Sequence, residues 1–456
     1  MIRRSGFMQV SLGAVLLAAG VAAAEPIALT GATVHTAIGP SIENATLVMD
    51  DGRITAVGTQ VAPPANARIV PCAGKHIWPG YVASFTTLGL TEVGSVRGTN
   101  DMQETGSVNP NIRAEVQINP ESDLLPVARV SGVTSALVVP RGGAIAGTSA
   151  LIHLVGWTHE DMTVRSPVAL HVQWPAMGIN RALSETRTEE DQKKERDQQI
   201  RQIRKSFDDA RAYWRAREAE GEAAIPRHDQ DVKWDAMRKA LRGEIPVVFH
   251  CSALNQIQAV LKFVDEQELK NLILADAYDA WRVADELKQR DVAVILAGTL
   301  GLPRRSYESY DMAMSLPARL HAAGVRFCIS EGGGASNVRN LPQHAAMAAA
   351  FGLPRDEALR SVTLYPARIL GAGDRLGSIE PGKVADLVVG DGDPLEVTTH
   401  VEQVYIAGKA ISMETRQTRL FEKYDHRPRG SKARPRKDTA SLRGNRTGAA
   451  ERTVGR

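Results

Sequence analysis

Residues 245–250 are Ile-Pro-Val-Val-Phe-His, a continuous apolar run that ends in a histidine. Before this run, Trp234, Met237 and Leu241 recur at helical spacing, and Gly243 is a typical helix stop. An apolar run without polar alternation is typical of a strand that is buried on both faces. The stretch therefore predicts a helix followed by a central strand of a parallel sheet.

The same alternation of strand and helix extends over residues 232–329. We expect strands at 271–274, 292–296 and 325–329, with a helix before each of them. Such an alternation predicts a parallel sheet that is covered by helices. Earlier in the chain, further apolar strands are expected at 133–139 and 168–172.

Short strands and turns make up both ends of the body. Neither 27–72 nor 376–420 is large enough to close a core alone, so we expect the two segments to pack together. The interpretation is a composite β-sandwich domain from 27–76 and 376–420, beside a barrel domain over 77–375. The strands expected here are 27–34, 45–49, 54–57, 386–389, 401–406 and 410–413.

A highly charged segment, 184–220, interrupts the rhythm of the barrel. Thr188 and Asp191 form a capping box that can begin a helix. Apolar residues then follow at spacings of three and four, which predicts one long amphipathic helix inserted into the barrel. We expect its apolar stripe to dock on the protein's own surface, and a partner interface is the alternative. The stripe consists of Ile200, Ile203, Phe207, Ala210 and Trp214.

The N-terminal 24 residues have the pattern of a signal peptide. Arg3 and Arg4 precede an apolar run over 7–21, and Ala22–Ala24 offers small residues for cleavage. We expect export to the periplasm, with an uncleaved anchor as the alternative. No second long apolar run follows, so the mature protein is not expected to span a membrane.

Charge is concentrated in the C-terminal segment, 427–456. It holds ten Lys/Arg against Asp438 and Glu451, whereas the body over 25–426 carries a net charge of −7. Because the segment has almost no apolar residues, we expect a disordered basic tail. A solvated tail without a partner is favoured over one that binds anionic lipids or polymers, and no nucleic-acid partner is expected.

Several motifs carry a family resemblance. Residues 51–58 and 78–82 look like an opening strand and the approach to a first barrel strand. The most specific motif is 376–389, Leu-Gly-Ser-Ile-Glu-Pro-Gly-Lys-Val-Ala-Asp-Leu-Val-Val. Over 27–420 the chain thus resembles the metal-dependent amidohydrolase superfamily, near its exported imidazolonepropionase-like branch. The resemblance implies a TIM (β/α)8 barrel, with metal-dependent hydrolysis of C–N bonds at the carboxyl ends of its strands.

The first barrel strand lacks the metal ligands that the resemblance implies. That strand normally ends in Asp-x-His-x-His, but Ala83, Phe85 and Thr87 stand at those positions. A bridging lysine of some branches would correspond to His153. His250 alone keeps the family's histidine, so a centre of two metal ions is not expected.

The remaining candidates define a reduced site. His250 is the expected metal residue, for at most one divalent ion such as zinc, and otherwise no cofactor is expected. Asp276 and Glu331 are the expected catalytic carboxylates. The competing interpretation is that His250 is a metal-free core histidine. The nine other histidines are expected mostly at the surface.

Two functions follow from this reduced site. One is an exported hydrolase of amide bonds whose activity is weak or absent because most metal ligands are lost. The other is a non-catalytic protein, which binds a small molecule or serves as the partner subunit of an intact homologue. A homo-oligomer is also compatible with the sequence. Function belongs to the site rather than the fold, so the residues around His250 decide between them.

Overall fold

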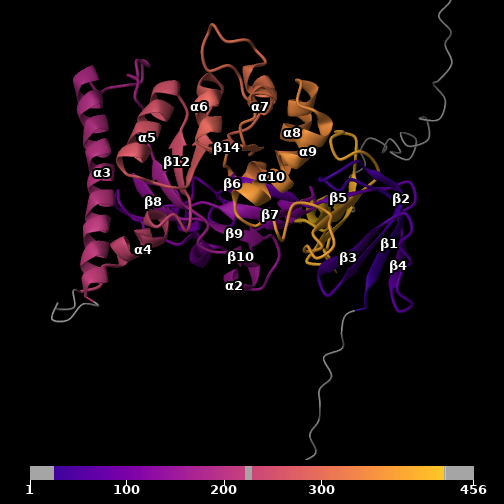
Figure 1. Cartoon of the computed structure of the whole chain (residues 1–456). Helices are drawn as coiled ribbons and strands as arrows, with labels where there is room; N and C mark the ends of the chain where they lie inside the picture. Colours follow the sequence, from indigo (N-terminus) through magenta and orange to yellow (C-terminus); the bar gives the residue numbers. More distant parts are fainter. Residues whose placement is uncertain (1–24, 221–228, 426, 428–456) are drawn as a thin grey trace, which may run out of the picture. The chain divides into compact units, whose positions relative to one another are not determined.

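The computed structural model describes residues 25–220, 229–425 and 427 (Figure 1). The described residues up to Met413 fold as one unit, and the second unit, from Glu414 on, includes α11 (Arg416–Asp425). The expected signal peptide and, apart from Arg427, the expected basic tail lie outside the described residues. None of the helices in the described ranges has the length and apolar character that a membrane crossing requires.

A six-stranded sheet forms the centre of the first unit, and five of its strands run parallel. The helices α4 (Val232–Leu241), α5 (Leu254–Glu266), α6 (Ala284–Gln289) and α7 (Met312–Ala323) precede or connect its later strands. The alternation expected over 232–329 is thus confirmed. Along the sheet the strands are β15 (Phe327–Ile329), β14 (Ala293–Leu296), β13 (Leu272–Asp276), β12 (Val247–Cys251), β11 (Leu170–Gln173) and β8 (Ile145–Thr148).

A second sheet continues the first. Its strand order is β10 (Thr163–Arg165), β9 (Ala150–His153), β7 (Val133–Val138) and β6 (Tyr81–Thr86). Only Ser149 separates β8 from β9, so one run over 145–153 belongs to both sheets, antiparallel to β7 and to β11. The connection from β7 to β8 is too short for a crossover helix, which is why this strand departs from the expected parallel arrangement.

Together the two sheets supply eight strand positions, from β6 and β7 through the 145–153 run to β11–β15. Within the described residues no backbone ladder joins β15 back to β6. Side chains bridge that junction instead. Ser84 Oγ donates to the carbonyl of Ile329 at 3.4 Å, and Ser330 Oγ donates to the carbonyl of Phe85 at 3.3 Å. The outer edges of the two sheets therefore meet beside the carboxyl end of β15.

An eight-stranded sheet combines both ends of the first unit. β5 pairs antiparallel with β16, with Trp78 opposite Val388, so segments 27–79 and 387–410 share this sheet as expected. A sandwich of two layers stays a prediction. The strands are β1 (Ile27–Val34), β2 (Ile42–Asp50), β3 (Arg53–Gly58), β4 (Arg68–Pro71), β5 (His76–Pro79), β16 (Leu387–Gly390), β17 (Val401–Ile406) and β18 (Lys409–Ala410).

The charged insertion is a single long helix, α3 (Glu189–Ala219). Thr188 caps it by accepting a hydrogen bond from the backbone of Asp191 at 3.1 Å. Ile203 and Phe207 are buried, and the Phe207 ring packs edge-on against Phe263 of α5 at 5.5 Å. The helix therefore docks on the protein's own surface, as expected. The other helices are α1 (Leu124–Arg129), α2 (His159–Met162), α8 (Leu341–Ala350), α9 (Arg355–Arg360) and α10 (Leu364–Ile369).

Candidate functional site

Neighbouring strand ends bring His250 and Asp276 together. β12 and β13 run in parallel with Cys251 opposite Asp276, so both side chains lie at the carboxyl edge of the sheet. His250 Nδ1 lies 3.9 Å from Asp276 Oδ2, an ion-pair distance that is too long for a hydrogen bond. Burial acts to raise the pKa of Asp276, but His250 and nearby guanidinium groups outweigh it and hold this pKa below its usual value.

The other nitrogen of His250 faces a second histidine. His250 Nε2 and His171 Nδ1 lie 3.0 Å apart, and His171 stands on β11, the next strand along. His171 is completely buried, and burial together with His250 lowers the pKa of His171 well below 6.5. Because His171 is neutral, one of the two rings donates a hydrogen bond to the other. This hydrogen bond fixes the orientation of the His250 ring.

The expectation that the other histidines lie mostly at the surface is met only in part, since His35, His76 and His159 are half-buried. Of those that the structure describes, only His321 and His400 are exposed, whereas His171 and His344 are buried. Buried strands and helices can accommodate a neutral imidazole when one of its nitrogens has a hydrogen-bonding partner.

Phe85 and Arg141 occupy the other side of His250. The ring centroids of Phe85 and His250 lie 5.1 Å apart, and the Arg141 guanidinium carbon lies 5.0 Å from the Phe85 centroid. Arg141 Nη2 also donates to the carbonyl of Gly333 at 2.9 Å. Where the family resemblance places an imidazole, this chain therefore has an aromatic ring covered by a cation.

Gly333 makes room for this stack. Its φ of +86° lies in the left-handed region, and an added Cβ would stand 2.2 Å from Arg141 Nη2 and 2.6 Å from Phe85 Cε1. Both distances are far below van der Waals contact. Glycine is thus required at this position for Phe85 and Arg141 to pack as they do.

Glu331 follows β15 and lines a cavity at the same edge as Asp276. Only 6% of Glu331 is exposed, and its Oε2 lies 3.3 Å from Ser330 Oγ. Within the described residues Glu331 Oε1 is buried without a hydrogen-bond partner. Burial raises the pKa of Glu331 to about 7, so this side chain is partly protonated at neutral pH.

The cavity has a volume of about 340 Å³ and a mixed lining. His344 of α8 contributes a donor, because its Nδ1 accepts from the backbone of Thr299 at 2.9 Å and the proton must stand on Nε2. Burial lowers the pKa of His344 to about 4, so the ring is neutral. The other polar side chains of the lining are Asp276, Tyr278, Arg304, Glu331, Asn337 and Asn340.

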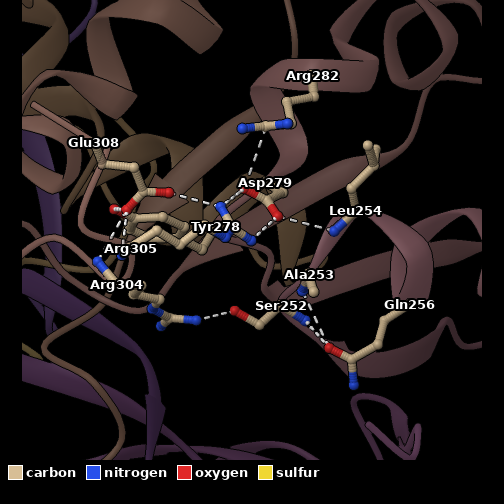
Figure 2. A network of polar contacts seen from close by, with 10 residues as sticks. All are labelled: Ser252, Ala253, Leu254, Gln256, Tyr278, Asp279, Arg282, Arg304, Arg305 and Glu308. Carbon is tan, nitrogen blue, oxygen red and sulfur yellow. Dashed lines mark hydrogen bonds and ion pairs between the residues drawn. The ribbon is translucent and has the colours of Figure 1, made fainter. Parts of the chain in front are cut away.

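A polar network holds the segment over 297–311, between β14 and α7, against the ends of β12 and β13 (Figure 2). Arg305 binds both carboxylate oxygens of the buried Asp279, one of them at 2.8 Å, and it also contacts Glu308. Tyr278 donates to Glu308 at 2.9 Å. The segment that lines the cavity is therefore anchored directly beside Asp276.

Arg304 lies in the same network and faces the cavity. Its guanidinium carbon stands 4.5 Å from the centroid of the Tyr278 ring, and its Nη1 donates to Ser252 Oγ (Figure 2). These two contacts hold the positively charged guanidinium of Arg304 at the cavity wall.

The structure corrects the placement of His153. β9 runs antiparallel to β7 with His153 opposite Ser135, so His153 lies away from the carboxyl ends of the parallel strands. There its Nε2 lies 3.1 Å from Asp386 Oδ2. His153 is therefore no counterpart of a bridging lysine. The antiparallel direction of β9 is the reason.

The side chains at this edge do not fit a centre of two metal ions. Among residues 25–220, 229–425 and 427, no group of three or more His, Cys, Asp or Glu is placed to hold a metal. His250 and Asp276 offer two donors, but Phe85 offers none, and the guanidinium of Arg141 would repel a dication. Two adjacent dications need several anionic ligands.

Comparison with known proteins identifies the class. Residues 160–411, more than half of the chain, match the Amidohydrolase family, so the chain belongs to this family. A solved amidohydrolase structure from Thermotoga maritima MSB8 is similar, with a TM-score of 0.76 and 26% identity, over 85% of this chain and 99% of that one. The predicted superfamily is confirmed, and so is the TIM-barrel fold that its members have.

Curated relatives agree with this assignment. The chain is 27% identical over 391 residues to Amidohydrolase tasK of Hapsidospora irregularis, which covers 80% of this chain and 39% of that protein. It is 34% identical over 151 residues to the imidazolonepropionase of Cupriavidus necator, which covers 31% of this chain and 36% of that protein. The chain therefore spans well under half the length of these two relatives.

Proposed function

We propose that this chain is an amidohydrolase-family protein that binds a small molecule without a metal centre, and whose hydrolysis of C–N bonds is weak or absent. The stack of Arg141 on Phe85 beside His250 carries this proposal. Metal-assisted hydrolysis needs a dication that lowers the pKa of a bound water and polarises a carbonyl. A guanidinium on an aromatic ring supplies neither an open coordination position nor an activated water.

The cavity supports binding. It combines the donors Arg304, His344, Asn337 and Asn340 with the carboxyl groups of Asp276 and Glu331. A small ligand is oriented in its pocket by a few polar groups that converge on it. The anchored 297–311 segment keeps part of this lining in place, so little ordering cost remains for binding.

A second candidate is a weak hydrolase with one divalent ion such as zinc. The 3.9 Å between His250 and Asp276, on adjacent strand ends, favours it. Glu331, whose pKa burial raises to about 7, then suits general acid–base work near neutral pH. The names of the two curated relatives, an amidohydrolase and an imidazolonepropionase, also support hydrolysis of C–N bonds.

Zinc titration separates the two candidates. The purified chain and His250→Ala are dialysed, analysed for bound metals and titrated with zinc by calorimetry, and both are screened on amides, lactams and dipeptides. Binding without a metal centre predicts no zinc uptake that depends on His250, and no hydrolysis above background. One equivalent of zinc that His250→Ala abolishes, together with hydrolysis above background that is lost with it, would favour the hydrolase instead. About two equivalents that survive dialysis would overturn both candidates.

Export and a partner subunit are further parts of the proposal. The pattern of Arg3, Arg4 and the apolar run 7–21 supports a periplasmic location. Mass spectrometry of the periplasmic fraction is expected to find a chain that begins near Glu25, and an intact Met1 end in the cytoplasm would contradict it.

A partner subunit with a complete ligand set would compensate for the ligands missing here. Co-purification of such a homologue with the tagged chain tests this.

A further inference from the structure

Two helix faces meet on the side of the barrel that carries the α3 insertion (Figure 1). Residues three and four apart on a helix share a face. Trp214 Nε1 of α3 donates to the carbonyl of Trp234 of α4 at 2.9 Å, so the two helices are in direct contact. Between them lies a cleft of about 490 Å³, which the turn after α5 also lines. Its lining is Arg211, Trp214, Arg215, Glu218, Arg238, Leu241, Arg242, Glu268 and Lys270.

Positive charge dominates this cleft. Five of its side chains are basic and two are acidic, and one of the acidic ones, Glu218, is paired with Arg242 at 2.7 Å. Within the described residues neither the Arg215 side chain nor the Lys270 side chain makes an ion pair or a hydrogen bond. Like charges held close together raise the free energy of the native state unless a counter-charge neutralises them.

Two of the arginines are fixed in position by their own contacts. The Arg238 guanidinium carbon lies 4.2 Å from the centroid of the Trp214 ring, and Arg238 Nε is buried without a partner in the described part of the chain. Arg211 Nη2 donates to the carbonyl of Gln267. Such contacts lower the entropy that the guanidinium groups lose when they bind a ligand.

We propose that this cleft is an anion site for phosphate-bearing molecules with two or more negative charges. Guanidinium groups match the oxygens of phosphate with paired hydrogen bonds, and several fixed cations favour a multiply charged anion over a monoanion. The site is separate from the cavity at Asp276. It is built on α3, α4 and Lys270, which precedes the amino end of β13, whereas Asp276 ends that strand. The inference therefore does not depend on the function proposed for the barrel.

Phosphate of this kind can come from a soluble molecule or from a lipid headgroup. Calorimetry of the full chain with inorganic pyrophosphate at constant ionic strength tests the first source. Co-sedimentation with vesicles that contain cardiolipin, whose headgroup carries two phosphates, compared with phosphatidylcholine vesicles, tests the second. Binding in either arm supports the anion site and identifies the source.

The variant for both arms combines Arg215→Gln with Lys270→Gln, because both side chains are exposed and unpaired within the described residues. Binding is expected to weaken at least about tenfold, since two charge-assisted contacts are lost. The control is Arg201→Gln, an exposed arginine on the same helix outside the cleft, which is expected to bind as the original chain does. The basic segment 427–456 is the same in all three proteins. The proposal fails if neither probe binds, if the double variant binds unchanged, or if the control weakens equally.

Discussion

The phenyl ring of Phe85 and the imidazole of His250 lie 5.1 Å apart, centroid to centroid, at an interplanar angle of 41°. They come from β6 and β12, at an edge where barrel enzymes assemble catalytic groups from different strands. An aromatic contact of this kind stabilises by about 0.5–1.5 kcal/mol, but it gives His250 no second metal ligand as a neighbour. Phe85, at a position where the family resemblance places a metal-binding imidazole, thus contributes to packing in this chain.

Restoring the family's imidazoles tests whether Arg141 excludes metal. We expect Phe85→His combined with Thr87→His to take up little zinc, because the guanidinium of Arg141 keeps its charge beside the new ligands. Adding Arg141→Met removes that charge and is expected to increase zinc affinity at least about tenfold. Calorimetric titration measures both. Equal zinc affinity with and without Arg141 would show that its charge is not the obstacle.

Much of the barrel could be predicted from local sequence. The apolar run at 247–249 and the glycine at 243 determine where β12 begins and where α4 ends, and neither signal depends on distant residues. The 145–153 strand was missed because its direction depends on the short connection after β7. Gly142 and Gly143 both adopt positive φ there, and they were the available signal.

The site was predictable only in part. His250 and Asp276 end neighbouring apolar runs, so their proximity follows from a parallel sheet. His171 carries a weaker signal, a single polar residue within the apolar strand over 170–172. Arg141 was missed although it follows β7, the strand that pairs with β6, because nothing in the sequence after Val138 indicates that its guanidinium stacks on Phe85.

The pair of His153 and Asp386 predicts a pH-dependent stability. Burial acts to lower the pKa of His153, but Asp386 outweighs it and raises this pKa, while His153 holds the pKa of Asp386 below its usual value despite burial. The contribution of His153 is complete below its unfolded pKa of about 6.5 and is lost as the pH rises through its raised folded value. The contribution of Asp386 is present above its unfolded pKa of about 3.9 and is lost as the pH falls through its lowered folded pKa.

His153→Gln is therefore expected to lower the free energy of unfolding by about 3 kcal/mol near pH 5.5, and by less near pH 8.5. Urea denaturation at the two pH values measures the difference. Asp386→Asn is expected to show the same pH trend, since it removes the other member of the pair. A loss for His153→Gln that is equal at both pH values would contradict the ion pair.

Glu331 predicts a second pH dependence of stability, with the same sign as that of His153 but caused by the burial of a carboxyl group. Burial raises its folded pKa to about 7, so between its unfolded value and pH 7 the native state binds more protons than the unfolded state. The contribution of Glu331 to the free energy of unfolding therefore falls as the pH rises through that window. Glu331→Gln is expected to be about 1–3 kcal/mol more stable than the original chain at pH 8, with little gain near pH 4.5. A gain of the same size at both pH values would mean that charge burial is not the cause.

The Asp279–Arg305 pair is expected to control the order of the cavity wall. The Asp279 side chain is 2% exposed, and it also accepts a hydrogen bond from the backbone of Leu254 at 3.0 Å. Arg305→Ala leaves this carboxylate without its main cation, at a cost of about 3–5 kcal/mol. Because Arg305 also contacts Glu308, amide hydrogen exchange should rise within 297–311.

Arg326→Ala is the matched control for this variant. Arg326 pairs with Asp291 at 2.6 Å, but the two side chains are 50% and 80% exposed, so the loss should stay below about 1 kcal/mol. Exchange within 297–311 should not change in this control. If Arg305→Ala destabilises the chain while exchange in 297–311 stays as slow as in the control, the pair stabilises the fold without ordering the cavity wall. Ligand binding at Asp276 would then have to rely on the strand ends alone.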